Sequence, residues 1–220
     1  MNTPTYAAML TTALLAPLAQ ADIAWQNDDR MLYAGIIDFD MQNVSGVNRG
    51  AYEVFTSIDR DTGSTYAKVE NDFRIENTIY KSETNLQVRT YQTSADILDA
   101  GGFLNGGSTL TLTERTTFRI EHQFSGSFTD RDEYIVSLTN NATDTEVFSL
   151  DAPPASEYSF ITLDAGQYTL VENYSIAGTI IPEPRTRSMY SYLAFNVVPA
   201  PASLALIAPA GLLATRRRRA

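Results

Sequence analysis

Residues 109–124, TLTLTERTTFRIEHQF, decide the fold class. Apolar side chains, among them Leu110, Leu112, Phe118 and Ile120, recur at every second position over most of the stretch, and mainly threonine, arginine and glutamate stand between them. A period of two residues is that of a β-strand with one buried and one solvated face. The stretch therefore predicts one long strand, in which the single histidine, His122, shares the buried face.

Shorter runs with the same period occur on both sides of this stretch. Strands are expected at 51–58, 86–92, 133–140, 168–176 and 190–198. Turn-forming residues separate the runs, and the glycines at 101, 102, 106 and 107 are assigned to a loop. Residues 96–104 fit either a short helix or a loop. Many short strands rich in threonine and tyrosine predict an all-β protein with a single β-sandwich or jelly-roll-like domain over residues 22–197.

The composition excludes several classes of function. The chain has 220 residues, with 16 lysines and arginines against 26 acidic residues, for a formal net charge of −10. Such an acidic chain is poorly suited to phosphate contacts, so no nucleic-acid partner is expected. The sequence has no cysteine, which excludes disulfides, thiol catalysis and cysteine-ligated metals. A single histidine excludes a site built from several histidines.

Residues 1–21, MNTPTYAAMLTTALLAPLAQA, have the features of a secretory signal peptide. An apolar stretch is followed by small residues, with Ala19 and Ala21 at the positions that precede signal cleavage. The segment lacks lysine and arginine, so only the α-amino group supplies positive charge at its start. A buried N-terminal helix is the alternative interpretation. Export through the Sec machinery is the prediction.

The other end of the chain, residues 198–220, combines three features in a fixed order. A Pro-x-Pro step leads into a short apolar segment that ends at Ala214, and a run of arginines follows. The residues that carry the pattern are Val198, Pro199, Pro201, Ser203, Arg216, Arg217, Arg218 and Arg219. The apolar segment is close to the length of a membrane span when it is counted from residue 197. The arginines then form a cytoplasmic stop, as the positive-inside rule predicts.

This tail resembles the PEP-CTERM sorting signal of Gram-negative bacteria. The resemblance implies recognition by an exosortase, a membrane-embedded transpeptidase that cleaves near the Pro-x-Pro step. The protein is then anchored transiently in the inner membrane and delivered to the outer surface or the extracellular matrix, commonly in biofilm-forming bacteria. Ala200 stands where the family name records a glutamate. An ordinary C-terminal membrane anchor is the alternative.

A second sequence, Ile181-Pro182-Glu183-Pro184, contains the glutamate of the family name. It lacks the apolar segment, because Arg185, Arg187 and polar residues follow it. The sorting signal is therefore assigned to residues 198–220 and not to this site.

Acidic side chains provide the only candidates for a cofactor site. Asp59 and Asp61, in the run DRDTGST, resemble part of a calcium-binding loop, but the terminal bidentate glutamate is missing at the required spacing. A hairpin turn is the simpler interpretation of this run. Residues 128–133 form a second, weaker calcium candidate. No other cofactor is expected.

Catalysis is not predicted. His122 is assigned to the core, and no nucleophile motif is present. Two groups of carboxylates, Asp38 with Asp40 and the acidic residues of 130–133, leave a carboxylate-dependent hydrolase open as an alternative. Tyrosines at 168, 174, 190 and 192 lie at strand spacing, where they either stack on sugar rings or pack in the core.

The sequence therefore predicts an exported, non-enzymatic surface or matrix protein, processed through its tail. Its β-domain is expected to be structural or adhesive, with extracellular polysaccharide as a candidate partner. A matrix-active hydrolase and a plainly membrane-anchored surface protein are the alternatives.

Overall fold

The computed structural model describes residues 22–36, 40–45, 50–60, 63–76, 78–90, 100–126, 128–151, 156–178 and 185–199. Within these ranges the chain forms twelve β-strands and no helix. The strands are β1 (Ile23–Ile36), β2 (Asp40–Ser45), β3 (Gly50–Arg60), β4 (Gly63–Glu76), β5 (Ile79–Thr90), β6 (Ala100–Leu112), β7 (Thr116–Gly126), β8 (Glu133–Asn140), β9 (Thr145–Asp151), β10 (Ser156–Leu163), β11 (Gly166–Ala177) and β12 (Arg185–Val197).

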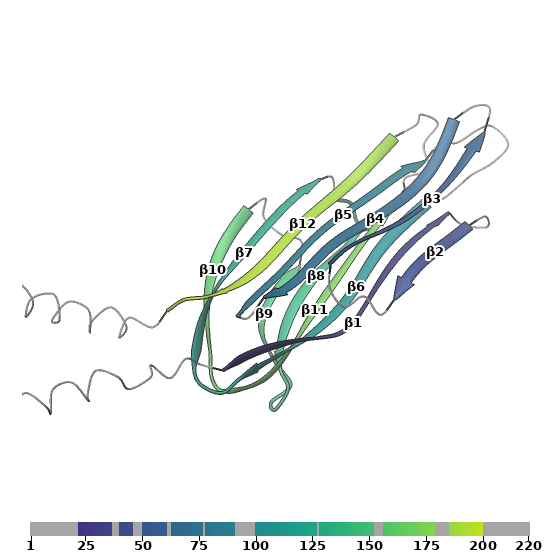
Figure 1. Ribbon diagram of the computed structural model, residues 1–220. Helices are drawn as coiled ribbons and strands as arrows, with labels where there is room; N and C mark the ends of the chain where they lie inside the picture. The colour runs from purple at the N-terminus through teal and green to yellow at the C-terminus, as the bar shows by residue number, and fades with distance from the viewer. Residues whose placement is uncertain are drawn as a thin grey trace, which may run out of the picture.

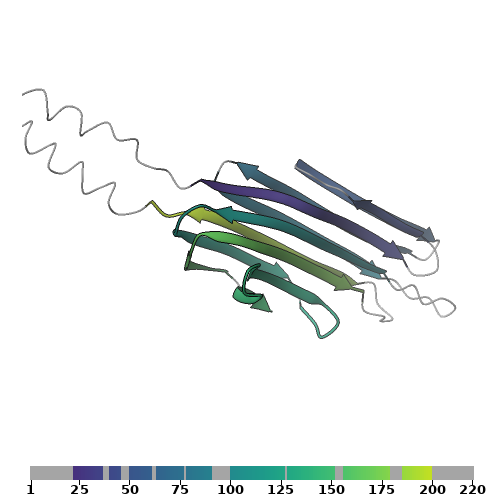
Figure 2. The same ribbon diagram turned by 90° about the horizontal axis from the view of Figure 1, so that it is seen from below.

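The strands form two six-stranded sheets. Sheet A has the order β2-β1-β6-β11-β8-β9, and sheet B has the order β10-β7-β12-β5-β4-β3. Neighbouring strands pair antiparallel throughout both sheets. Figures 1 and 2 show the sheets as two layers whose strands follow the long axis of the molecule. The predicted all-β sandwich is confirmed.

The stretch that predicts one long strand forms two strands in different sheets. Residues 109–112 end β6 of sheet A, and residues 116–124 belong to β7 of sheet B. The three residues between them, which include the exposed Glu114, carry the chain from one layer to the other. Because three residues connect the strands, inward-facing residues fall at even-numbered positions both before and after the crossing. Leu112 and Thr116 therefore both face the core. The alternation therefore continues through the crossing and conceals it.

The glycines assigned to a loop lie in β6, a central strand of sheet A, so that prediction was wrong. Residues 100–104 are part of the same strand and form no helix. Two of the glycines occupy inward positions where a side chain has no room. A Cβ on Gly102 would lie 2.7 Å from Val69 Cγ2, and one on Gly106 would lie 2.9 Å from Arg30 Cζ. Packing accounts for these two glycines and a turn does not: Gly102 faces Val69 of the opposite sheet, and Gly106 lies beside Arg30 of the neighbouring strand β1.

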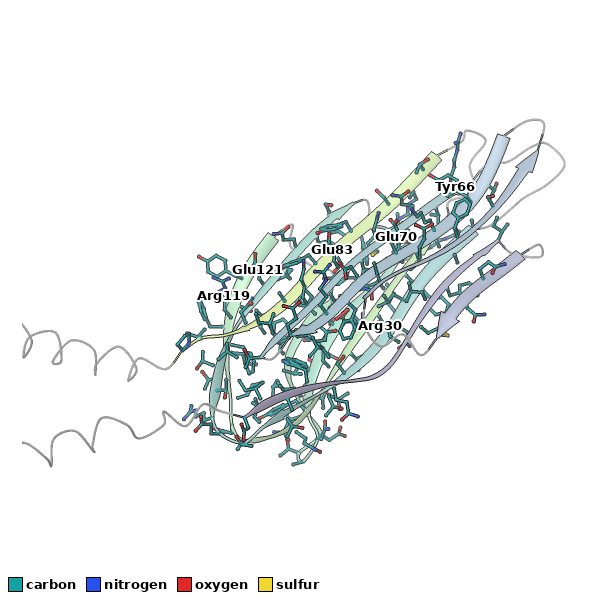
Figure 3. All side chains as sticks on the ribbon, in the orientation of Figure 1. Arg30, Tyr66, Glu70, Glu83, Arg119 and Glu121 are labelled. Carbon is teal, nitrogen blue, oxygen red and sulfur yellow. The ribbon has the colours of Figure 1, made fainter. Side chains whose placement is uncertain are left out.

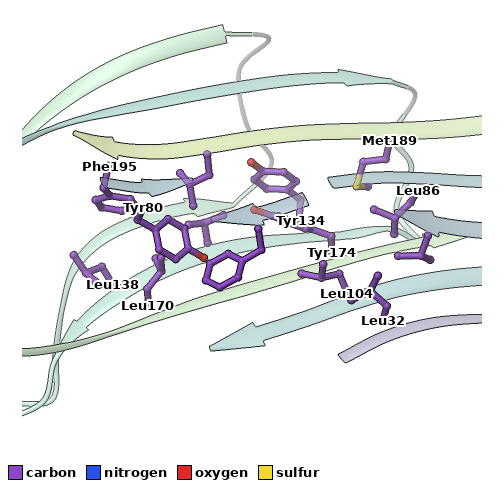
Figure 4. Close-up of a cluster of buried hydrophobic side chains, with 14 of the residues drawn as sticks. Leu32, Tyr80, Leu86, Leu104, Tyr134, Leu138, Leu170, Tyr174, Met189 and Phe195 are labelled. Carbon is purple, nitrogen blue, oxygen red and sulfur yellow. The ribbon is translucent and has the colours of Figure 1, made fainter. Parts of the chain in front are cut away.

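Inward side chains from both sheets form one continuous core (Figure 4). Leucines such as Leu32 and Leu104 of sheet A and Leu86 of sheet B are fully buried, and each such side chain contributes about 1.5–3 kcal/mol of burial free energy. Tyr168 and Tyr174 are also buried. These two tyrosines are core residues and are excluded from the surface stripe that the sequence left open.

The described chain begins and ends at the same end of the sandwich, at the left of Figure 1. The backbone N–H of Thr113 donates to the carbonyl of Asp22, and that of Val198 donates to the carbonyl of Thr117. Residues 113 and 117 flank the crossing between β6 and β7. The two predicted processing points therefore adjoin one end of the folded body.

Candidate functional site

Among the side chains that the structure describes, most of the charged ones that the two sheets present to solvent lie on the outer face of sheet B. Alternation along β4 and β5 turns one set of residues outward and buries the other. The described outward residues of these two strands are Tyr66, Lys68, Glu70, Asp72, Arg74, Glu76, Ile79, Lys81, Glu83, Asn85, Gln87 and Arg89. Figure 3 shows labelled members of this set, with Arg119 and Glu121 of β7, spread along the sheet.

A hollow of about 390 Å³ lies on this face. Its volume falls within the range of small-molecule sites, about 300–1,000 Å³. The hollow is lined by Ala51, Glu53, Glu70, Asn71, Asp72, Glu83, Asn85 and Tyr190. The strand register explains the grouping, since Glu53, Glu70, Asn85 and Tyr190 lie side by side across four neighbouring strands.

Ion pairs fix the carboxylates of the hollow. Lys68 Nζ lies 3.0 Å from Glu53 Oε2 and 2.7 Å from Glu70 Oε1. The hydrogen bond from Lys68 is the main cause that holds the pKa of Glu70 below its usual value. Asn85 Nδ2 donates to Glu70 Oε2 over 3.0 Å. Glu70 is therefore a fixed hydrogen-bond acceptor, whereas a general acid needs a raised pKa.

Two half-buried tyrosines of β12 complete the face. The hydroxyl of Tyr190 donates to Glu83 Oε1 over 3.2 Å, and burial together with that carboxylate raises the pKa of Tyr190. The hydroxyl thus stays protonated at neutral pH. Lys81 Nζ lies 5.1 Å from the ring centroid of Tyr192, within range of a cation–π contact. Tyr190 and Tyr192 were candidates from the sequence, and the structure places both on the surface.

A buried polar network lies beneath the hollow and joins the two sheets. Arg30 of β1 and Glu172 of β11 form an ion pair of 3.4 Å, and both side chains have no solvent exposure. From sheet B, Ser82 donates to Glu172 Oε2 over 2.8 Å, and Tyr80 donates to the other carboxylate oxygen. Arg30 Nη1 donates to Asn71 Oδ1 over 3.3 Å. Such an enclosed pair stabilises only if further hydrogen bonds accompany it, and Tyr80, Ser82 and Asn71 of sheet B supply them.

The network connects the core to the hollow through Asn71. Its amide nitrogen donates to Thr84 Oγ1 over 2.9 Å and to the carbonyl of Glu83 over 3.2 Å, which ties β4 to β5 under the hollow. Burial lowers the pKa of Arg30, but Tyr80 and Glu172 outweigh it, so the net pKa is raised. Arg30 therefore remains charged in the core. The network positions the floor of the site and has no solvent access for chemistry of its own.

The outer face of sheet A differs in chemistry. Every outward side chain of its central strands β6 and β11 is uncharged, and most are small, such as Thr109, Thr169 and Ser175. An uncharged flat face offers fewer strong hydrogen-bond acceptors than the face of sheet B. The candidate site is therefore assigned to sheet B.

The predicted role of His122 agrees with the structure, because the side chain is buried at an inward position of β7. Asp132, a candidate of the second calcium run, has a structural role that the sequence did not predict. Its carboxylate accepts hydrogen bonds from Arg187, from the backbone N–H of Thr129 over 2.7 Å and from that of Ala177 over 3.1 Å. Asp130 and Glu133 remain exposed. This carboxylate clamps the β7–β8 connection onto β11 and β12.

The other calcium candidate is only partly described. Asp59 lies in β3, where its backbone pairs with Ser64 of β4, which confirms the hairpin. Asp61 and Asp38 lie outside the described residues, as does the side chain of Asp40. Among the residues that the structure describes, no group of three or more acidic or histidine side chains is placed to hold a metal ion.

The processing signals lie almost wholly outside the described residues. The undescribed parts are residues 1–21, with Ala19 and Ala21, and the tail from Ala200 onward, with Pro201, Ser203 and Arg216 to Arg219. Residues 181–184, to which no signal is assigned, also lie outside the described residues. Val198 and Pro199 are described and follow β12 directly. In the described part of the chain, no helix has the length and apolar character needed to cross a bilayer.

Sequence reasoning missed most of the hollow and all of the buried network. The signal for the hollow was present, because residues 66–76 alternate between charged or tyrosine side chains and mainly apolar ones. Arg30 and Glu172 gave no such signal. Arg30 follows two aspartates in β1, Glu172 is the one charged residue of β11, and the two partners are 142 residues apart.

No protein-family model matches the chain, and no curated protein matches its sequence. One similar solved structure is the enzymatically active domain of tailspike protein 4 of bacteriophage CBA120, with 9% identity, a TM-score of 0.30, and coverage of 68% of this chain and 19% of that one. Another is a family 11 carbohydrate-binding module from Clostridium thermocellum in complex with a β-1,3-1,4-mixed-linked tetrasaccharide, with 9% identity, a TM-score of 0.21, and coverage of 80% and 96%. At these scores neither structure identifies a relative.

Proposed function

We propose that this protein is exported, sorted to the cell surface or extracellular matrix through its C-terminal tail, and binds polysaccharide on the outer face of sheet B. The hollow beside Tyr190 carries the binding part of the proposal. The sorting part rests on the resemblance of residues 198–220 to the PEP-CTERM signal, with the Sec machinery and an exosortase as processing partners. Tail cleavage near Pro199 would leave all twelve strands intact, because β12 ends at Val197.

The chemistry of the hollow suits a ligand rich in hydroxyl groups. Carboxylate and amide oxygens of Glu70, Glu83 and Asn85 accept hydrogen bonds from hydroxyls, and the amide nitrogens of asparagine donate them. The half-buried ring of Tyr190 offers an apolar face for the C–H side of a sugar ring. In this proposal the body binds and does not hydrolyse, and no metal takes part.

Binding is tested by electrophoresis of the purified full chain through gels that contain single polysaccharides. We expect retardation by at least one polysaccharide and a loss of about tenfold in affinity for Tyr190→Ala, equivalent to about 1.4 kcal/mol. Tyr190→Phe retains the ring and serves as the matched control. Unretarded migration in every gel contradicts the binding proposal, and release of reducing ends from a retarding polysaccharide supports the hydrolase instead.

Sorting is tested separately by intact-mass spectrometry of the protein recovered from its host. The expected mass lacks both residues 1–21 and the tail arginines. Mature protein that retains Arg216 to Arg219 contradicts the sorting proposal and supports a plain membrane anchor. This measurement does not depend on the outcome of the binding experiment.

A further inference from the structure

Exposed aromatic side chains lie at both edges of the face that carries the hollow. On edge strand β3, Phe55 is 49% exposed, and its ring centroid lies 6.1 Å from that of Tyr66 on β4. On the opposite edge strand, β10, Tyr158 and Phe160 are 67% and 61% exposed, with centroids 6.3 Å apart. Large apolar side chains grouped on a surface indicate an interaction site.

The strand register relates these two aromatic pairs. Phe55 aligns through Lys68 and Gln87 with Ser188 of β12, and Tyr158 aligns through Glu121 with Ala194 of the same strand. The two positions on β12 are six residues apart, which is about 20 Å along the strand. Five strand spacings, about 24 Å, separate β3 from β10. The aromatic pairs are therefore roughly 30 Å apart on an oblique line.

This oblique line passes over the hollow. Tyr190 and Tyr192 lie between residues 188 and 194 of β12, and the hollow occupies the neighbouring positions on β5, β4 and β3. In Figure 3 the labelled side chains Tyr66, Glu70 and Glu83, followed by those on β7, occur in that order along the molecule. The pair at Phe55, the two tyrosines of β12 and the pair at Tyr158 thus form a path across the sheet. The hydrogen-bonding side chains of the hollow lie midway along it. A ligand that contacts all three aromatic groups must be long and extended.

The charge of the hollow restricts the ligand further. Every charged residue that lines it is acidic: Glu53, Glu70, Asp72 and Glu83. The basic side chains nearest these carboxylates are engaged. Lys68 binds Glu53 and Glu70, Arg74 binds Asp72 over 2.8 Å, and Lys81 lies 3.6 Å from Glu83. The carboxylates of a polyanionic ligand would lie against the carboxylates of the hollow, whose basic neighbours are already in ion pairs. Because like charges repel, such a ligand is disfavoured.

We propose that the outer face of sheet B binds one long, linear, uncharged polysaccharide chain, which runs obliquely from Phe55 through the hollow to Tyr158. This inference rests on the proposed function and adds the length, direction and charge of the ligand. Binding at several points along one chain also explains exposed aromatic side chains on both edges of a single face. Polysaccharides that carry carboxylates are rejected.

The experiment uses the full chain and affinity electrophoresis in EDTA, which removes bridging cations. Hydroxyethylcellulose, galactomannan and mixed-linkage β-glucan are the neutral probes, and carboxymethylcellulose, alginate and polygalacturonate are the acidic probes. We expect retardation by a neutral probe and at least tenfold weaker retardation by each acidic one. Phe55→Ala and Tyr158→Ala are each expected to weaken neutral binding roughly threefold to tenfold, the range that one aromatic contact supplies.

Two controls separate the path from a general loss of structure. Phe103→Ala removes a half-buried aromatic side chain from the outer face of sheet A and should leave binding unchanged. A trisaccharide of the bound polysaccharide, measured by calorimetry, should bind Tyr158→Ala as well as the parent, because Tyr158 lies on β10, two strands beyond Tyr190 of the hollow. Urea unfolding of each variant checks the fold.

The outcomes distinguish this inference from the proposed function. If every probe migrates unretarded, the proposed function fails and this inference fails with it. If acidic probes bind as well as neutral ones, or if Phe55→Ala and Tyr158→Ala bind like the parent while Tyr190→Ala does not, the site remains and the oblique neutral path is overturned.

Discussion

Glu172→Gln is the substitution that most directly tests how the two sheets are held together. The change keeps the shape of the side chain and removes its charge. In the native fold this carboxylate faces Arg30 and accepts hydrogen bonds from Tyr80 and Ser82, and neither member of the ion pair is exposed. The variant would leave the guanidinium buried without a counter-charge.

The size of the effect follows from burial. Removal of one partner of a fully buried ion pair costs about 3–5 kcal/mol. A domain of this kind has a total unfolding free energy of about 5–15 kcal/mol. We therefore expect Glu172→Gln to lose about a fifth or more of the free energy of unfolding, with an unchanged dependence on denaturant because the surface exposed on unfolding is the same.

Urea unfolding followed by tryptophan fluorescence measures this loss. Trp25 is the only tryptophan of the chain, is nearly buried, and has its ring centroid 4.8 Å from that of Tyr80. Its emission therefore reports on the packing around the network. Glu121→Gln is the matched control, since its 3.4 Å pair with Arg119 lies on the surface and should contribute at most about 1 kcal/mol.

A double-mutant cycle separates the ion pair from other effects of the substitution. In Arg30→Met the carboxylate of Glu172 loses its cation, and the combined variant has neither charge. We expect the combined variant to be more stable than the sum of the single losses predicts, by about 2–3 kcal/mol, because no uncompensated charge remains. A loss below about 1 kcal/mol for Glu172→Gln, or strictly additive losses, would refute the argument that the buried charges depend on each other.

Three further outcomes are expected. Gly106→Ala should lower the free energy of unfolding in urea by about 1–3 kcal/mol, because the added Cβ meets the guanidinium of Arg30, which its hydrogen bonds hold in place. Gly101→Ala would make only ordinary contacts and should change the stability little. Lys68→Met should raise the pKa of Glu70 in an NMR titration. The pKa of Glu70 is lower in the folded protein than in the unfolded chain, so its carboxylate stabilises the fold above about pH 4.5. This stabilisation is lost as the pH falls through the pKa of the folded state, and the pH dependence of unfolding should be weaker in Lys68→Met. Asp132→Asn should cost about 1.5–3 kcal/mol and accelerate hydrogen exchange at residues 128–133, and unchanged exchange there would contradict the proposed clamp.

The candidate site is formed by outward side chains of several separate strands. Tyr190 and Tyr192 could be selected from strand spacing alone. Glu53, Glu70 and Glu83 could not, because nothing local indicates that three separate strands bring them into one row. That row depends on the register between β3, β4 and β5.

The sequence by itself determined the strand period, the acidic and cysteine-free composition, and the burial of His122. These properties are local, since alternation along a strand records which side chains face inward whatever the partner strand is. Tertiary structure alone decided that residues 109–124 cross between sheets, that Gly102 of β6 makes room for the opposite layer, and that Arg30 meets Glu172. Each of these depends on contacts between segments far apart in the chain, and the free energy of a buried charge is set by the partner that folding brings to it.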